Sequence, residues 1–147
     1  MTVESDRAAV VAEARSWIGT RYRHMGRAKG PGGGVDCAQL VWCVFHQLGL
    51  TPDMPLLPYP SDFMLHRGTE RYMQTVLDRA REIDNARAKP GDLVLYRVGR
   101  LYAHGAIIDG PGWPHIIHAW YAARAVIADI GTGHRLAGRP RKFFSRW

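Results

Sequence analysis

The sequence has 147 residues, which is the size of one globular domain and leaves little room for a second. Hydrophobic residues make up 46% and charged residues 22% of the chain, a composition that excludes wholesale disorder. The formal net charge is +7, which fits either a polyanionic partner or a solvated basic face. Most of the excess lies in residues 134–147, which carry five basic residues and no acidic one.

Apolar residues at helical spacing mark three segments in the first half of the chain. The predicted helices cover residues 5–18, 37–48 and 69–81. Ser5 is expected to cap the first helix, and Gly49 to follow the end of the second. The glycine-rich run 30–34 is interpreted as a flexible loop, because it lacks the lysine and the preceding strand of a phosphate-binding loop. The prolines of residues 51–61 exclude a regular helix there.

Short β-rich runs separated by glycine and proline turns follow in the second half. The predicted strands cover residues 93–98, 103–109, 116–120 and 125–129. Helices first and strands later predict an α+β fold with an antiparallel sheet. The sequence shows neither an internal repeat nor an interdomain linker, so residues 1–147 are expected to form a single domain. Its basic C-terminal segment, residues 134–147, is interpreted as a strand or a docking segment.

Cys37 is the most informative residue for chemistry. Asp36 is a favourable N-cap residue, which places Cys37 at the first helical position, and Gln39 completes the pattern of a capping box. A thiolate at that position is stabilised by free backbone N–H groups and the helix dipole, as a nucleophile requires. Cys37 is equally a candidate for a small buried hydrophobic residue. Cys43 lies in mid-helix and is expected to be structural.

A cysteine nucleophile needs a base, and two histidines are placed to provide it. His104 and His118 each alternate with apolar residues along a predicted strand. On adjacent strands the first imidazole would take the thiol proton and the second would orient the first. His115 is expected on the opposite face, in solvent. A zinc site that combines these histidines with Cys37 and Cys43 is disfavoured, because the spacing is not that of zinc ligands.

These patterns together resemble the NlpC/P60 family of cell-wall cysteine peptidases. The resemblance covers about residues 8–130 and rests on short segments that follow the family's order and spacing. They are Gly19-Thr-Arg-Tyr-Arg-His, Val35-Asp-Cys-Ala-Gln-Leu-Val, Lys89-Pro-Gly-Asp-Leu-Val-Leu-Tyr, Ala103-His-Gly-Ala-Ile-Ile-Asp-Gly and Ile116-Ile-His-Ala. The proline-rich insert at residues 51–66 resembles a subgroup found in phage and prophage tail modules.

The resemblance implies a papain-like α+β fold, in which N-terminal helices, including the nucleophile helix, pack on an antiparallel sheet. It implies that Cys37 is the nucleophile, His104 the general base and His118 the residue that orients the base. Tyr22 matches a family tyrosine that assists at the oxyanion. Asp36 matches a residue that caps the helix and contacts substrate. The resemblance implies neither a metal nor another cofactor.

The function expected from the resemblance is that of a murein endopeptidase, which hydrolyses a γ-D-glutamyl amide bond in peptidoglycan stem peptides. One alternative is an N-acyl amidase or acyltransferase with the same triad. Another is a tail assembly component with a vestigial site. Ala38 and Gln39 replace the family's common Ser-Gly and support this last alternative. Gln39 is also expected to add bulk near the cleft.

The expected location follows from what the chain lacks. Its first residues have neither the basic start nor the apolar core of a signal peptide, and no apolar run approaches the roughly 18 residues that span a bilayer. Two cysteines make no disulfide framework and favour a reducing site of synthesis. We therefore expect cytoplasmic synthesis and carriage in a virion, with action on the cell wall.

Two kinds of partner fit the basic segment 134–147. Contact with phage tail proteins or with anionic wall polymer is the favoured interpretation. Phe143, Phe144 and Trp147 lie among its basic residues and are candidates for stacking on bases. We nevertheless expect no nucleic-acid partner, because a C-terminal strand explains the same residues.

Overall fold

The computed structural model describes residues 2–53 and 71–147, so the predictions for residues 54–66 and for the start of the third helix lie outside the described residues. Within the described ranges the helices are α1 (Val3–Ser16), α2 (Cys37–Gln47) and α3 (Arg71–Leu77). The strands are β1 (Arg27–Ala28), β2 (Gly34–Val35), β3 (Arg81–Ile83), β4 (Leu93–Val98), β5 (Leu101–Ile108), β6 (His115–Trp120), β7 (Ala125–Ile130) and β8 (Arg141–Ser145). Short 3₁₀ turns are η2 (Asn85–Arg87), η3 (Tyr121–Ala123) and η4 (His134–Leu136).

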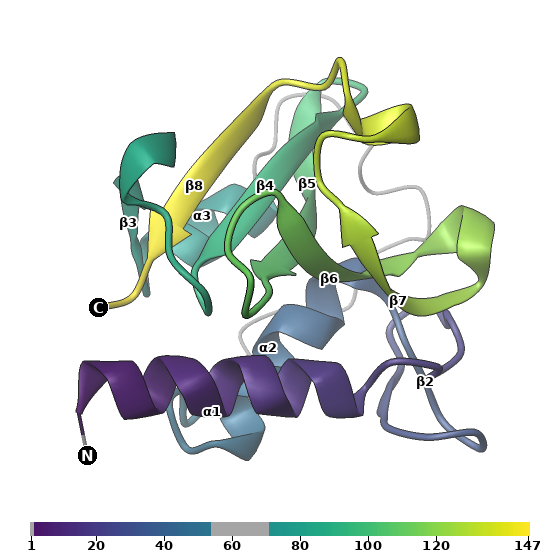
Figure 1. Ribbon diagram of the computed structural model, residues 1–147. Coiled ribbons are helices and arrows are strands. Elements are labelled where there is room, and N and C mark those ends of the chain that lie inside the picture. The colour runs from purple at the N-terminus through teal and green to yellow at the C-terminus, as the bar shows by residue number, and fades with distance from the viewer. Residues whose placement is uncertain (1, 54–70) are drawn as a thin grey trace.

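An antiparallel sheet with the strand order β3-β8-β4-β5-β6-β7 forms the centre of the molecule (Figure 1). Side chains alternate between its faces. On one face Leu95, Ile107 and Phe144 pack with the buried residues of the helices, and on the other Tyr96 and Ile108 form a second apolar cluster. The predicted α+β class is confirmed, and each of the four predicted strands is present to within two residues at either end.

Helix α1 begins earlier than predicted. Thr2 is its N-cap, and Ser5 is the third helical residue of a reciprocal capping box, in which each side chain bonds the other residue's backbone N–H. The predicted cap at Ser5 is therefore wrong by three positions. Ile18 lies beyond the helix and is 45% exposed, so it is not part of the apolar stripe. Among the described helices, none has both the length and the apolar character needed to cross a membrane.

The loop before α2 is more ordered than predicted. It contains an antiparallel hairpin of β1 and β2, and the glycine-rich run forms the hairpin turn. A Cβ added at Gly33 would lie 2.0 Å from the carbonyl oxygen of Ala28, so only glycine allows this close approach. Val35 in β2 is fully buried and leads directly into Asp36 and α2. The hairpin thereby anchors the residue that caps the helix.

Helix α2 follows its prediction and supplies much of the core. Asp36 is its N-cap, and the Asp36 carboxylate accepts the Gln39 N–H at 2.9 Å. All residues from Cys37 to Phe45 are buried. The capping box is only half formed, because neither polar atom of the Gln39 side chain has a hydrogen-bond partner within the described part of the chain. The predicted reciprocal bond from Gln39 is therefore wrong.

Two strands of the sheet were not assigned as strands by their periodicity. The third helix ends at Leu77, before the predicted end, and residues 81–83 form the edge strand β3. Strand β8 comes from the basic C-terminal segment and lies inside the sheet, between β3 and β4. Phe143 and Phe144 are 4% and 0% exposed, on opposite faces. The strand interpretation is confirmed, and these two rings do not stack on bases.

Candidate active site

Cys37 stands at the first position of α2 with its thiol turned toward β5. The side chain is 3% exposed, and its Sγ lies 3.8 Å from the carbonyl oxygen of Ala103. Burial, followed by the negative charge of Asp36, raises the pKa of the thiol to about 12. The sequence predicted a stabilised thiolate, but loss of hydration outweighs the helix terminus. The resting residue is a neutral thiol that needs a base.

His104 and His118 lie on the neighbouring strands β5 and β6, as predicted. His104 Nε2 and His118 Nδ1 are 2.8 Å apart, and both rings are buried. Burial lowers the pKa of His104 well below its ordinary value, and the adjacent His118 adds to the effect. Burial also lowers the pKa of His118, although Asp129 opposes it. Both imidazoles are therefore neutral near pH 7, when they can act as bases.

Asp129 completes this chain and was missed by the sequence analysis. Its Oδ2 lies 2.9 Å from His118 Nε2, and its Oδ1 accepts the Ile130 N–H at 2.8 Å. Asp129 lies on β7, where His118 is directly opposite Ile127, so the carboxylate is the diagonal neighbour of the imidazole. Its signal is an acidic residue at the end of a β-rich run, which becomes informative only when the strand register is known.

When both rings are neutral, the hydrogen bonds that join His104, His118 and Asp129 can run in only one direction. An ionised Asp129 accepts and does not donate, so His118 carries its proton on Nε2. His118 Nδ1 is then the acceptor, and His104 donates from Nε2. This leaves the lone pair of His104 on Nδ1, the nitrogen that faces away from His118. Asp129 therefore fixes, through His118, the tautomer of His104, which is the candidate base for the thiol proton.

Cys37, His104 and Tyr22 line one cavity of about 240 Å³, which we name the Cys37 cavity. Its other lining residues are Val98, Ala119, Trp120, Tyr121, Ala122, Arg135 and Arg139. His118 and Asp129 stand behind His104 rather than in the wall. Gln39 is fully buried and does not line this cavity, so the expected bulk near the cleft is wrong.

Tyr22 and Asp36 flank the nucleophile in different ways. Burial and the neighbouring Cys37 raise the pKa of Tyr22, so its hydroxyl stays protonated and can donate a hydrogen bond into the cavity. The Asp36 carboxylate is buried and accepts the backbone N–H groups of Gln39 and Met25, at 2.9 and 2.7 Å. Asp36 therefore caps α2, as predicted, and also holds the loop at Met25 against the helix.

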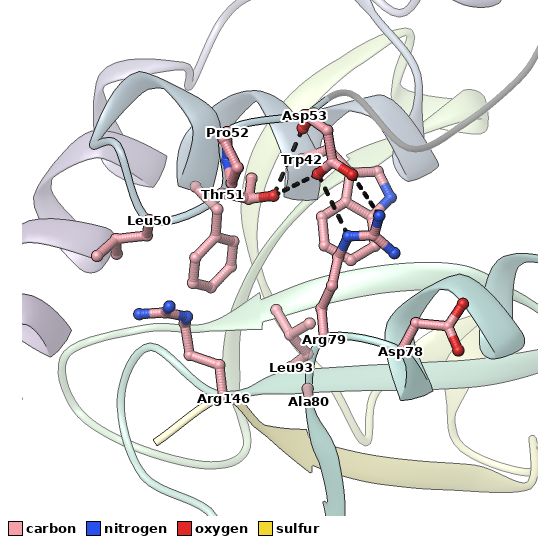
Figure 2. A pocket seen from close by; sticks show the side chains of 11 residues that line it. Trp42, Leu50, Thr51, Pro52, Asp53, Asp78, Arg79, Ala80, Leu93 and Arg146 are labelled. Carbon is pink, nitrogen blue, oxygen red and sulfur yellow. Dashed lines mark hydrogen bonds and ion pairs between the residues drawn. The ribbon is translucent and has the colours of Figure 1, made fainter.

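A larger cavity of about 370 Å³ lies elsewhere and lacks this chemistry (Figure 2). We name it the Trp42 cavity after the indole in its wall. Thr51 and Asp53 lie on one side of it, and Arg79 reaches across to form an ion pair with Asp53. Arg146 projects from the opposite side. Neither Cys37 nor His104 lines this space, so volume alone does not identify the reactive site.

The described residues offer no cluster of metal ligands. Within residues 2–53 and 71–147, no three His, Cys, Asp or Glu side chains are grouped as they would be to hold a metal ion. His115 is exposed at the start of β6, on the face opposite to His118, as predicted. The chemistry available to the described site is therefore that of a thiol, two imidazoles, a carboxylate and a phenol.

Comparison of the sequence with family models and with curated proteins gives no match. Solved structures do match. The peptidoglycan hydrolase RipB from Mycobacterium tuberculosis is 23% identical, with a TM-score of 0.65 over 97% of this chain. The NlpC/p60 domain of the peptidoglycan hydrolase SagA is 24% identical, with a TM-score of 0.61 over 92% of this chain. RipD from M. tuberculosis, a non-catalytic NlpC/p60 domain protein, is 18% identical, with a TM-score of 0.59 over 95% of this chain.

The fold is that of NlpC/P60 domains, which confirms the predicted fold class. The chain covers 96% of the SagA domain and 95% of RipD, but only 65% of the RipB structure. Because RipD is described as non-catalytic, the fold by itself does not establish activity. Function has to be argued from the residues of the Cys37 cavity.

Proposed function

We propose that the protein is a cysteine peptidase that hydrolyses peptidoglycan, at a γ-D-glutamyl amide bond of the stem peptide. The observation that carries the proposal is the placement of Cys37 and His104 in one cavity wall, with His118 and Asp129 bonded in series behind the base. Similarity to structures described as peptidoglycan hydrolases supports the substrate class. The γ-D-glutamyl bond rests on the resemblance of the sequence motifs.

The first half of the reaction forms a thioester. As the thiol approaches the substrate carbonyl, its proton moves to His104 Nδ1 and the sulfur attacks the carbonyl carbon. Negative charge develops on the carbonyl oxygen, which accepts hydrogen bonds from the Tyr22 hydroxyl and the Cys37 backbone N–H. That N–H is the first of α2 and has no partner within the helix. His104 then gives its proton to the leaving amine, which departs.

The second half releases the acyl group. A water molecule gives a proton to the neutral His104 as its oxygen attacks the thioester carbonyl. The intermediate collapses, the carbon–sulfur bond breaks, and the sulfur takes the proton back from His104. The product is a free carboxylic acid, and the neutral thiol is restored. His118 and Asp129 keep the His104 ring in one tautomer and orientation through both halves.

Digestion of purified sacculi tests the proposal. Wild-type protein is expected to release peptide fragments with new γ-glutamyl carboxylates, identified by mass spectrometry. Cys37→Ala is expected to abolish the release, because no other group in the cavity wall can form the thioester. Cys43→Ser is the matched control, since Cys43 is also a buried cysteine of α2 but lies outside the Cys37 cavity. It is expected to digest sacculi as wild type does.

Three other results would contradict the proposal. Free lactyl ends among the fragments would indicate an N-acyl amidase with the same residues. Equal digestion by wild type and Cys37→Ala would exclude Cys37 as the nucleophile. Binding of sacculi without any cleavage would assign the protein to the non-catalytic class that RipD represents.

We also propose that the protein is made in the cytoplasm and carried in a phage or prophage tail, where it would help to penetrate the cell wall. The support is the resemblance of the proline-rich insert, residues 51–66, to tail-associated members of the family. Mass spectrometry of purified phage particles should then detect the chain in stoichiometric amounts. Its absence from particles that infect normally would refute this part.

A further inference from the structure

Two arginines stand in the wall of the Cys37 cavity, and the proposed reaction does not use them. Arg135 lies in η4, and Arg139 lies shortly after it. The Arg139 guanidinium is held in place, because its Nε donates to the carbonyl oxygen of Arg135 at 2.9 Å and its Nη1 to that of Arg97 at 3.3 Å. Arg135 is exposed, and within the described part of the chain its side chain forms no hydrogen bond. The loop thus presents two cations beside Cys37 and His104.

Within the described part of the chain, Arg135 and Arg139 lack acidic partners of the kind that Arg7, Arg15 and Arg79 have. Arg7 pairs with Asp92 at 2.9 Å, Arg15 pairs with Asp109 at 2.8 Å, and Arg79 in the Trp42 cavity pairs with Asp53 (Figure 2). Within residues 2–53 and 71–147, neither Arg135 nor Arg139 forms an ion pair with a carboxylate. Two guanidinium groups that line one small cavity favour the binding of an anion there.

We propose that Arg135 and Arg139 bind a carboxylate of the substrate that lies next to the scissile amide. The inference rests on the proposed function, and it identifies the substrate class as γ-glutamyl peptides whose α-carboxylate is free rather than amidated. A guanidinium fits a carboxylate with two parallel hydrogen bonds. Val98, Ala119 and Ala122 form an apolar part of the cavity wall. The positive charge in the wall comes from Arg135 and Arg139.

The position of Arg139 links this recognition to catalysis. Its charge adds to burial and to His118 in lowering the pKa of His104. A carboxylate bound to Arg139 offsets that charge, so the basicity of His104 increases when the correct substrate is present. Peptides without the carboxylate would meet a weaker base as well as a weaker binding site.

Two matched peptides test the inference. One is a γ-D-glutamyl stem peptide with a free α-carboxylate, and the other carries a carboxamide there. Wild-type protein is expected to cleave the first with a kcat/KM about tenfold higher or more, the effect of one charge-assisted hydrogen bond. Arg135→Gln is expected to remove most of that difference, by slowing cleavage of the carboxylate peptide alone. Arg139→Gln is also expected to remove most of the difference, and because it removes a charge that weakens His104, it should not slow cleavage of the carboxamide peptide.

Arg146→Gln is the matched control, because it removes one charge from the same C-terminal segment but lies in the Trp42 cavity. It is expected to keep the wild-type preference. A general disturbance of the loop would slow both peptides equally, and equal losses would therefore overturn the inference. Equal cleavage of the two peptides by wild type would overturn it too.

A binding measurement separates this inference from the proposed function. Calorimetry with the Cys37→Ala protein compares the affinity for the two peptides without any turnover. An affinity that is about tenfold higher for the carboxylate peptide, and that Arg135→Gln abolishes, supports the inference even if no cleavage occurs. Equal affinities refute it even if sacculi are digested by Cys37-dependent chemistry.

Discussion

Asp129 determines the tautomers of the two buried imidazoles, His104 and His118, through two hydrogen bonds. Its own orientation is set by the Ile130 N–H, which donates to Oδ1 and leaves Oδ2 for His118. An asparagine at this position would keep its carbonyl oxygen toward the Ile130 N–H and turn its amide N–H₂ toward His118. Every donor and acceptor in the chain would then reverse, and His104 would carry its proton on Nδ1, where it needs a lone pair.

Asp129→Asn is therefore expected to reduce kcat by about 10²- to 10⁴-fold with little change in KM, because the base is held in the wrong tautomer. Asp129→Ala is the control, since it removes the carboxylate without imposing a tautomer and should cost less. Kinetics on a soluble stem peptide measure kcat and KM, and ¹⁵N NMR of the imidazoles reports the tautomers directly. An Asn variant with near wild-type kcat would exclude the proton chain.

Strand β8 illustrates what periodicity can and cannot predict at the scale of an element. The run Leu93–Val98 was predicted correctly because β4 is a long inner strand bounded by a clear turn. In β8 the adjacent residues Phe143 and Phe144 face opposite sides of the sheet, and both sides are covered. Such a strand shows no apolar–polar alternation. Its basic flanks instead made the segment resemble a docking tail.

Phe144→Ala is expected to lower the free energy of unfolding by about 3–5 kcal/mol, because it leaves a cavity at a fully buried position between the sheet and the helices. Urea denaturation followed by circular dichroism measures the change. Phe144→Leu keeps most of the apolar volume and should cost less. Deletion of residues 141–147 removes an inner strand and is expected to prevent folding. A loss below about 1 kcal/mol for Phe144→Ala would contradict the burial.

At the scale of the whole molecule, local sequence identified the centre of the site but not its surroundings. Cys37 and the two strand histidines were found because capping and alternation are local patterns. Asp129 and Arg135 reach the site only through strand register and through the return of the chain toward β8. The same tertiary packing reversed the expected ionisation of Cys37, since burial depends on residues far away in the sequence.

Burial of neutral histidines also makes the stability of the whole protein depend on pH. The pKa values of His104 and His118 are lowered from the ordinary value of 6.5, so between 6.5 and the lowered values the unfolded chain binds more protons than the folded one. The two neutral imidazoles therefore contribute their full stabilisation above pH 6.5. As the pH falls below 6.5, the free energy of unfolding decreases by up to about 1.4 kcal/mol per pH unit for each histidine. The pKa of Asp53 is lowered from its ordinary value of 3.8 to about 2, so the stabilisation that Asp53 contributes is lost only below pH 3.8.

Urea denaturation between pH 5 and 7 should show that the free energy of unfolding decreases as the pH falls. His104→Gln should reduce this dependence on pH, whereas His115→Gln, at an exposed position, should not. A flat profile would mean that the buried imidazoles accept protons in the folded state.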